Sequence, residues 1–300
     1  MRSTWEQTET GRNGLPGSPG SVPGSETGHS GPGRFASNLR ISLVIPAKNE
    51  AESLPHVLGK VPAWVHEVIL VDGLSEDDTS RVAKLCLPEI RIVAQSGRGK
   101  GNALREGFLR CRGDVVVALD ADGSMDPAEI SMFVELIAMG HDYVKGSRML
   151  PGGSSVDLTL WRRFGNWSFR TLTNILTGSR YSDLCYGYFA FRRGTIDTLD
   201  LRSDGFEIET EINIKAHKAG LRIAEVPSAE AIRQHGSSQL NAIRDGLRIL
   251  FTILRTSFGS DRTTQSYELI EAPKHDAATP ATAAVPVSRD RAASDANGRD

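Results

Sequence analysis

The sequence predicts an α/β fold, in which one domain carries a mostly parallel sheet flanked by helices. Four short apolar runs, rich in β-branched residues, lie between residues 41 and 122, and each ends in polar residues or glycine. They read ISLVIP, EVILVDG, IRIVAQ and DVVVALDAD. Stretches with helical periodicity, such as SRVAKLCL and GNALREGFLR, separate them. Strands that are apolar on both faces and alternate with helices are typical of a parallel sheet covered on both sides.

The two ends of the chain differ in composition from the middle. Residues 1–38 are rich in Gly, Pro, Ser and Thr, and residues 260–300 contain proline and no helical periodicity. Such segments cannot bury enough apolar surface to offset the entropy lost on ordering, so we expect two disordered tails. The folded domain is expected over residues 39–239, followed by a basic amphipathic helix over 240–259.

The overall composition excludes several classes of protein. A formal net charge of −2 gives no global reason to expect a nucleic-acid partner. Cys86, Cys111 and Cys185 form neither a disulfide framework nor a zinc spacing, which favours a reducing compartment. No stretch approaches the roughly 20 apolar residues of a membrane span, and the N-terminus does not read as a signal peptide. We therefore expect a cytoplasmic protein.

The ends of the predicted strands are where a ligand is expected. In open parallel sheets, ligands bind outside the carboxyl ends of the strands. These ends are residues 46–50, 72–75, 96–101 and 120–124. The third of them, GRGKG, has glycines that would let backbone N–H groups approach an anion. It is neither a Walker loop nor a dinucleotide fingerprint, because Gly101 and Asn102 stand where those motifs need Ser or Thr and a third glycine.

Asp120 and Asp122 end the last run, one residue apart. In an extended segment residues i and i+2 point to the same side, so both carboxylates would face one point. Like charges so close repel unless a cation lies between or beside them. Mg²⁺ or Mn²⁺ suits such a pair, with phosphate oxygens and water completing its shell, and Ser124 could add a further contact. The alternative is an ordinary turn that favours aspartate.

The tetrapeptide DPAE that follows predicts a helix start. Asp126 would cap the helix, Pro127 would take its first position, and Glu129 would reach back to the cap. We therefore expect Asp126 and Glu129 to be structural.

Nine short motifs follow one another over residues 40–245. They are VIPAKNEAESL, EVILVDGLSEDDT, GRGKGNALREGF, ALDAD, KGSR, DLCYGYFAF, GFEIETEI, EVPS and RQHGSSQL. In this order they resemble family 2 glycosyltransferases of the GT-A fold, and among them the branch that transfers mannose or glucose to polyprenyl (dolichyl) phosphate.

The resemblance implies a nucleotide-sugar site at the strand ends. The residues that would cradle the base and ribose at the first strand end are Pro46, Ala47, Asn49 and Glu50. Asp72 would take part in base or ribose recognition; the family often has a second acidic residue there, whereas Gly73 follows in this chain. Lys100 and Gly101 would lie near the nucleotide. Asp120 and Asp122 match the metal-binding pair that holds the donor diphosphate.

The resemblance also implies the residues of the transfer step, a single displacement that inverts the anomeric carbon. Arg148 and Arg233 are candidates for holding a donor or acceptor phosphate, since a guanidinium fork suits that group. Asp183 and Glu209 are candidates for a base or a sugar-orienting group. A phosphate acceptor is largely ionised at neutral pH, so a strong base would be dispensable.

Two points about these motifs stay open in the sequence. Glu207 and Glu211 would share a face with Glu209 in a strand but spread apart in a helix. Ser237 and Ser238 are further candidates for phosphate contact, whereas His235 reads as a loop residue.

Two segments could bring the chain to a lipid acceptor. Residues 157–178 mix tryptophan and phenylalanine with arginine, and residues 240–258 form a basic amphipathic pattern with a net charge of +2. The alternative for both is a helix packed on the sheet or on another subunit. Many members of the resembled branch carry C-terminal membrane spans and this chain has none, so a membrane partner protein is also considered.

We thus expect a metal-dependent, inverting hexosyltransferase that uses GDP-mannose or UDP-glucose type donors and polyprenyl phosphate, in peripheral contact with the inner face of the membrane. One alternative is a glycosyltransferase with a soluble or glycan acceptor. Another is a nucleotide-sugar-binding module without turnover. The sequence separates neither the donor bases nor Mg²⁺ from Mn²⁺, and it leaves the oligomeric state open.

Overall fold

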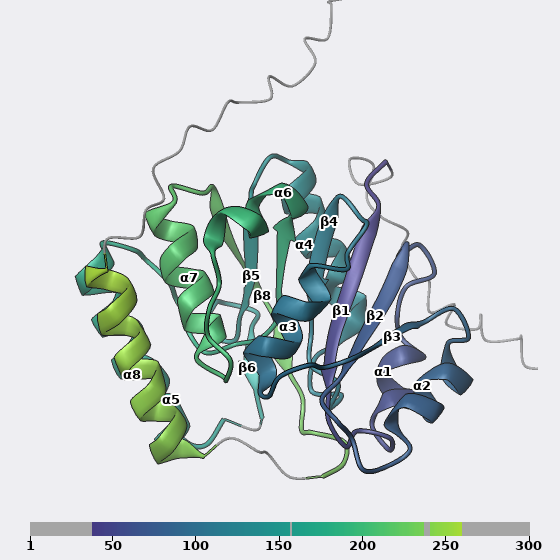
Figure 1. The fold of residues 1–300 in the computed structure, drawn as a ribbon. Coiled ribbons are helices and arrows are strands. Elements are labelled where there is room, and N and C mark those ends of the chain that lie inside the picture. The colour runs from purple at the N-terminus through teal and green to yellow at the C-terminus, as the bar shows by residue number, and fades with distance from the viewer. Residues whose placement is uncertain (1–37, 157, 237–240, 260–300) are drawn as a thin grey trace, which may run out of the picture. The chain divides into compact units, whose positions relative to one another are not determined.

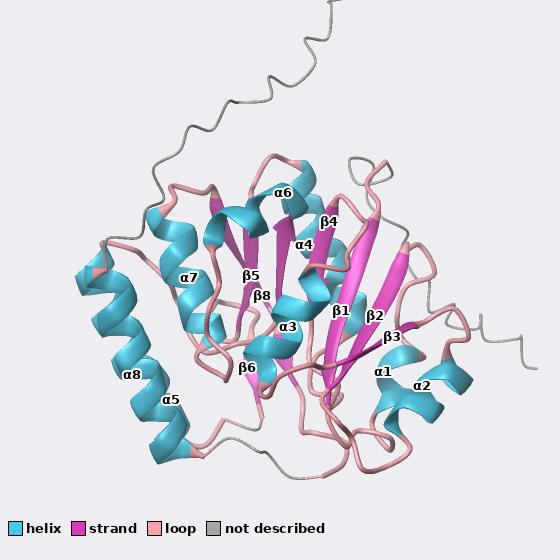
Figure 2. Cartoon of the chain, in the orientation of Figure 1, coloured by secondary structure: helices cyan, strands magenta, loops and turns pink. Residues whose placement is uncertain are grey.

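The computed structural model describes residues 38–156, 158–236 and 241–259, in which seven strands form one sheet (Figures 1 and 2). Their order is β3-β2-β1-β4-β7-β5-β8. The strands are β1 (Ile41–Ala47), β2 (Glu67–Asp72), β3 (Arg91–Ala94), β4 (Val115–Ala118), β5 (Tyr143–Ser147), β7 (Phe189–Arg192) and β8 (Ile223–Pro227). The expected tails lie outside the described residues, Asn38 apart, and so do Ser237 and Ser238.

The sheet is parallel except around one strand. β1 pairs in parallel with β2 and β4, β2 with β3, and β5 with β8. β7 runs antiparallel between β4 and β5. A separate parallel pair joins β6 (Ser154–Ser155) to β9 (Ala229–Glu230). This topology confirms the predicted α/β fold, and the four predicted runs form β1 to β4.

Helices cover both faces of the sheet (Figure 1). One core packs α1, α2 and α4 on the sheet, and the other packs α3, α6 and α7 on the opposite face. The helices are α1 (Leu54–Leu58), α2 (Thr79–Cys86), α3 (Lys100–Phe108), α4 (Ile130–Ala138), α5 (Leu160–Thr177), α6 (Arg193–Ile196), α7 (Ile208–Lys218) and α8 (Ala242–Phe258). Strands buried between two helical layers account for runs that are apolar on both faces.

The last described helix, α8, lies beside α5 and α7 rather than on the sheet (Figure 1). Its buried side includes Ile249 and Ile253, which join a small core with residues of α5 and α7. Its opposite side leaves Ile243, Leu247 and Phe251 exposed. No helix among the described residues combines the length and the apolar character needed to cross a bilayer.

The predicted helix start at DPAE is correct in part. The Asp126 carboxylate accepts a hydrogen bond from Ala128 N at 3.1 Å, and a 3₁₀ turn at Pro127–Glu129 leads into α4. The expectation that Glu129 reaches back to the cap was wrong. Its carboxylate accepts instead from Ser228 Oγ and, at 3.0 Å, from Ala229 N. Glu129 therefore ties the start of α4 to the segment around β9.

Close packing of α3 on the sheet gives a first prediction. A Cβ at Gly107 would press on Val44 Cγ1 of β1 and approach Val71 Cγ2 at 3.2 Å. We expect Gly107→Ala to lower the unfolding free energy by about 1–2 kcal/mol, because overpacking exceeds the gain of roughly 1 kcal/mol in helix propensity. Urea denaturation would measure the change.

Gly165 in α5 is the matched control, since a Cβ there would meet nothing within 4 Å. Gly165→Ala should raise the unfolding free energy by about 0.5–1 kcal/mol. If Gly107→Ala stabilised the chain as much as Gly165→Ala, α3 would not be packed on β1 as described.

Candidate active site

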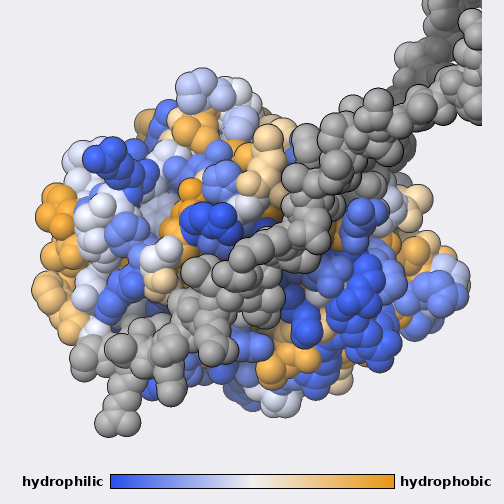
Figure 3. Space-filling view, turned by 90° about the horizontal axis from the view of Figure 1, so that it is seen from above, coloured by the Kyte–Doolittle hydropathy of each residue, from blue (hydrophilic) through white to orange (hydrophobic). Residues whose placement is uncertain are grey.

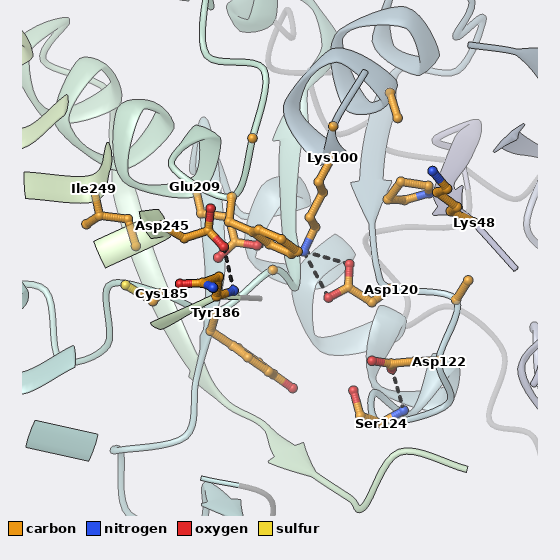
Figure 4. A pocket seen from close by; sticks show the side chains of 18 of the residues that line it. Lys48, Lys100, Asp120, Asp122, Ser124, Cys185, Tyr186, Glu209, Asp245 and Ile249 are labelled. Carbon is orange, nitrogen blue, oxygen red and sulfur yellow. Dashed lines mark hydrogen bonds and ion pairs between the residues drawn. The ribbon is translucent and has the colours of Figure 1, made fainter. Parts of the chain in front are cut away.

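A large cavity of about 1080 Å³ opens at the carboxyl ends of β1, β2, β3 and β4 (Figure 4). At one end it is lined by residues that follow these strands, including Ala47, Gly73 and Gln95. At the other end it is lined by the first turns of α5 and α8, including Trp161 and Arg244. Both predicted metal-binding aspartates lie between these ends. The cavity therefore connects the strand ends with the α5–α8 pair.

Lys100 lies between two carboxylates at the centre of the cavity. Its Nζ is 2.7 Å from Asp120 Oδ1 and 2.6 Å from Glu209 Oε1. Figure 4 shows the amine of Lys100 directed at Asp120. A Cβ at Gly187 would lie 2.5 Å from Lys100 Nζ and 2.8 Å from Glu209 Oε1, so a side chain at this position would displace the cluster. Three separate segments thus fix one cation between two acids.

The cluster shifts the acid–base properties of its members. Burial raises the pKa of Asp120 to about 6, with repulsion from Asp122 and Glu209 acting in the same direction and Lys100 opposing it. Burial lowers the pKa of Lys100, but attraction from Asp120 and Glu209 outweighs burial and raises that pKa above its usual value. Lys100 is therefore a permanent cation in this site.

Asp122 has a cation of its own. Arg233 Nη2 lies 2.8 Å from Asp122 Oδ2, and Arg233 Nη1 lies 3.0 Å from Glu50 Oε1. The segment that carries Arg233 is held along the turn at 122–124, because Gln234 N donates to Asp122 O at 3.1 Å and Ala231 N to Ser124 O at 2.8 Å. Burial raises the pKa of Glu50, and Arg233 partly offsets this effect.

The two aspartates line the same cavity, but neither belongs to a strand. β4 ends at Ala118, so the expectation that an extended segment directs both carboxylates to one side was wrong. Asp120 faces Lys100, whereas Asp122 Oδ1 accepts a hydrogen bond from Ser124 N at 2.9 Å in a turn (Figure 4). Both carboxylates and Ser124 nevertheless line the same space.

The donor set of this space fits a hard divalent ion. Among the described residues, no three or more His, Cys, Asp or Glu side chains are grouped so that they could enclose a metal ion. Two carboxylates completed by phosphate oxygens and water are, however, the ligand set that Mg²⁺ usually takes in phosphate-binding sites. Asp120 and Asp122 offer that pair of carboxylates, and the thioether of Met125 beside them already accepts a hydrogen bond from Asp120 N at 3.4 Å.

The guanidinium of Arg148 is held by two carboxylates and a backbone carbonyl. It binds Asp183 through Nε at 2.7 Å and Glu230 through Nη1 at 3.1 Å, and Nη2 also donates to Cys185 O at 2.9 Å. Burial would raise the pKa of Asp183, but hydrogen bonds and attraction from Arg148 outweigh burial and lower that pKa. Arg148 borders the cavity, whereas Asp183 is fully buried behind it.

Residues predicted at the first two strand ends have different surroundings. Pro46, Ala47 and Glu50 line the cavity. Asp72 accepts hydrogen bonds from Ser75 N at 2.9 Å and Ser80 Oγ at 2.7 Å, and its side chain organises the turn after β2.

Asn49 and Gly101 also serve the local backbone. Asn49 has a positive φ of 57° and its side chain accepts from Glu76 N at 2.8 Å. Gly101 N donates to Asp204 O at 2.8 Å, and a side chain at Gly101 would collide with Ser203 O. Both residues thus shape loops that border the cavity.

The three glutamates of GFEIETEI lie at the start of a helix, which settles the question left open by the sequence. α7 begins at Ile208, and Glu209 is the one of the three that lines the cavity. Glu211 is buried, pairs with Lys215 Nζ at 2.9 Å, and accepts from Ser203 N at 2.7 Å. Glu207 O𝜀1 accepts from Gly205 N at 3.1 Å.

Sequence reasoning missed the cavity wall made by the start of α8. Asn241 Oδ1 accepts from Arg244 N at 3.0 Å, and Asp245 Oδ2 accepts from Asn241 N at 2.7 Å, so the two side chains cap the helix reciprocally. Asn241, Arg244 and Arg248 line the cavity. The capping residues in NAIRD indicate where the helix starts, but no sequence pattern indicates where α8 packs.

The buried Arg148–Asp183 pair gives a second prediction. Arg148→Met would leave Asp183 buried without its cation, and we expect a loss of about 3–5 kcal/mol in unfolding free energy at pH 7. Because the pKa of Asp183 is lowered in the fold, this loss should shrink as the pH falls below about 4, where the unfolded carboxyl becomes protonated. Denaturant titrations at several pH values would measure both effects.

Arg40→Met is the control, because the Arg40–Asp114 pair is exposed. It should change the unfolding free energy far less than Arg148→Met. Equal losses from the two substitutions would contradict the burial described for Arg148.

Comparison with known proteins places the chain among enzymes. The family model described as Glycosyl transferase family 2 matches residues 42–199. An undecaprenyl-phosphate mannosyltransferase of Micrococcus luteus is 32% identical over 215 residues, covering 68% of this chain and 88% of that protein. A polyprenol monophosphomannose synthase of Mycolicibacterium smegmatis is 32% identical over 238 residues, covering 74% and 89%. These matches confirm the predicted resemblance to the polyprenyl-phosphate branch.

A solved structure shares the fold of this chain. Glucosyl-3-phosphoglycerate synthase from Mycobacterium tuberculosis, solved in complex with Mn²⁺, UDP and phosphoglyceric acid, superposes with a TM-score of 0.61 at 22% identity. The superposition covers 76% of this chain and 82% of that structure. From the extent of the family match and the identity to these relatives, the chain belongs to glycosyl transferase family 2 and is a glycosyltransferase.

Proposed function

We propose that the chain transfers a sugar from a nucleoside diphosphate sugar to polyprenyl phosphate, with a divalent cation bound by Asp120 and Asp122. The names of the two relatives support the acceptor class, because one names undecaprenyl phosphate and the other polyprenol monophosphomannose. The observation that carries the proposal is the continuity of the cavity. It runs from the acidic pair to Trp161 and Arg162 on α5, at the edge of an exposed apolar surface.

The donor end would be the end formed by β1, β2 and β3. Ala47, Gly73 and Gln95 lie at neighbouring strand ends, where a base and ribose can lie against backbone and short side chains. The diphosphate would then reach Asp120 and Asp122, and Mg²⁺ or Mn²⁺ bound there would neutralise charge on the leaving diphosphate. Arg233 now neutralises Asp122, so a dication would compete with Arg233 for this carboxylate.

The transfer step needs little acid–base help from the protein. A phosphate oxygen of the acceptor would form a bond to the anomeric carbon while the bond from that carbon to the diphosphate oxygen breaks, and the nucleoside diphosphate leaves. The attacking oxygen is already ionised at neutral pH. Lys100 and Arg233 supply fixed positive charge near the reacting groups, and Glu209 is held in place by Lys100.

The acceptor end would face an anionic lipid bilayer. Trp161, Phe164 and Trp167 stack in a row along α5, with ring centroids 6.1 and 6.0 Å apart, and all three are more than half exposed. α8 adds further exposed apolar residues, namely Ile243, Leu247, Phe251, Leu254 and Phe258. Figure 3 shows apolar surface along its left edge, the side on which α5 and α8 lie in Figure 1.

Basic residues accompany this apolar surface. Arg163 of α5 and Arg244, Arg248 and Arg255 of α8 lie on the two helices that carry it. Aromatic and aliphatic side chains flanked by arginine suit the headgroup region of a membrane. A lipid phosphate drawn from that bilayer would enter the cavity between α5 and α8, where Arg162 and Arg244 line it.

The third prediction tests the reaction itself. Purified protein would be mixed with polyprenyl phosphate, Mg²⁺ or Mn²⁺, and in separate reactions GDP-mannose, UDP-glucose or UDP-N-acetylglucosamine. We expect a glycosyl-phosphoryl-polyprenol by mass spectrometry with one donor. Asp122→Asn or a chelator should reduce the product at least about 100-fold, because the diphosphate would lose its counter-charge.

Asp78→Asn is the matched control. Asp78 pairs with Arg81 on the surface of α2, away from the cavity, so its loss should leave the rate unchanged. If a nucleotide sugar binds with metal but none of the donors yields a lipid product, the lipid acceptor is wrong and a soluble acceptor takes its place.

The fourth prediction concerns the membrane surface. Phe164→Glu and Phe251→Glu place a charge on exposed positions that do not line the cavity. Each should lower binding to phosphatidylglycerol vesicles roughly 10-fold or more, since a buried phenylalanine contributes about 2 kcal/mol. Vesicle flotation measures binding, and donor affinity should stay unchanged.

Leu85→Glu provides the comparison, because Leu85 is also more than half exposed but lies on α2. Equal losses from all three substitutions, or no binding by the wild-type chain, would refute membrane contact through α5 and α8.

A further inference from the structure

Gln95 is a buried amide at the end of β3, directly after the last strand residue. Only 6% of its surface is exposed. Its Nε2 donates two hydrogen bonds, to Gly99 O at 2.8 Å and to Asn102 Oδ1 at 2.9 Å. A flipped amide would turn its oxygen toward these two acceptors, which is unfavourable. The orientation of the amide is therefore fixed by the loop that leads into α3.

The oxygen of the same amide is left without a donor. Gln95 Oε1 accepts no hydrogen bond from any residue that the structure describes, while Gln95 lines the cavity. It faces Gly73, because a Cβ built at Gly73 would lie 3.0 Å from Oε1. An amide oxygen that no protein donor reaches and that borders a cavity can accept a hydrogen bond from a ligand there. Oε1 is thus an acceptor of fixed orientation that a donor in the cavity can reach.

A strained apolar residue stands on the neighbouring strand end. Leu74 has a φ of +59°, which is rare for a bulky residue, yet its side chain is 59% exposed and lines the same cavity. The turn is held by Asp72, which accepts from Ser75 N, and by Ser75 Oγ, which accepts from Asn49 N at 3.0 Å. Strain of this kind usually marks a functional position. Leu74 presents an apolar surface beside the acceptor of Gln95.

We propose that Gln95 selects the base of the nucleotide donor. Its Oε1 would accept the ring N–H of uracil (N3–H) or guanine (N1–H), which share this donor chemistry, with the apolar side chain of Leu74 beside the ring. Cytosine and adenine present a lone pair at the corresponding ring nitrogen and would face Oε1 with a second acceptor. This inference rests on the proposed function, because it assumes that the nucleotide lies at the β1–β3 end of the cavity.

In this proposal the Gln95 amide takes the place of the second acidic residue that is missing after β2. Gly73 carries no carboxylate, and its lack of a side chain is what leaves Gln95 Oε1 open to the cavity. The acceptor for the base would therefore come from β3 instead of β2.

The test compares nucleotides that differ at this ring position. Calorimetric titration of the full chain, with Mn²⁺ present, would give the affinities for UDP, CDP, GDP and ADP. We expect the wild-type chain to prefer UDP to CDP, or GDP to ADP, by about 10- to 100-fold, and the stronger of UDP and GDP identifies the base. Gln95→Met removes the acceptor and should bring that ratio to within about threefold.

Two further variants separate base selection from a general loss of structure. Gly73→Ala keeps Gln95 but sets a methyl group 3.0 Å from Oε1, and it should also reduce the ratio. Asn102→Ala removes one anchor of the amide and keeps Oε1 and the bond to Gly99 O, so it should retain the ratio even if both affinities fall. Thermal unfolding of each variant checks that it is folded.

The outcomes distinguish the two proposals. If none of the four nucleotides binds in the presence of metal, the proposed function itself is wrong. If they bind but the wild-type ratios are near one, or if Gln95→Met and Gly73→Ala keep the wild-type ratio, base selection by Gln95 is wrong while the proposed function stands.

Discussion

The arrangement of this site depends on three cations, each of which is shared between two buried or half-buried carboxylates. Lys100 serves Asp120 and Glu209, Arg233 serves Glu50 and Asp122, and Arg148 serves Asp183 and Glu230. Three cations thus face six acids, and each cluster keeps one excess negative charge when its acids are ionised. Removing charges from water is costly unless they are paired, so these contacts hold the strand ends and loops in one arrangement. The excess negative charge that remains is what a divalent cation can neutralise.

The three clusters differ in how much of them faces the cavity, and the difference suits different tasks. Asp183 is fully buried, so its pairing with Arg148 positions the loop that leads to Gly187. Asp120 and Asp122 border the open space, where each is paired with a cation that a ligand can meet. The same type of ion pair therefore serves stability where it is fully buried and is open to a ligand where it borders the cavity.

Much of the fold could be predicted from the sequence because its strands carry strong local signals. The runs that form β1 to β4 are apolar and end in polar residues, and their ends do meet at one cavity. What could not be predicted depends on distant partners. No local pattern shows that Arg148 binds Glu230, that Glu129 binds Ser228, or that the start of α8 closes the cavity. Gln95 closes the run IRIVAQ and was not singled out from the sequence, because the bonds that fix its amide become apparent only once the following loop is folded.

The position of α8 in the chain has a consequence for the order in which the protein is made. Every described strand precedes α8, yet its first turn supplies one wall of the cavity. During synthesis the N-terminal part of a domain leaves the ribosome first. The strand-end half of the cavity can therefore assemble while the wall beside α5 is still missing. A nascent chain would hold an open half of the cavity first, and the cavity would become enclosed only after α8 has left the ribosome and packed beside α5.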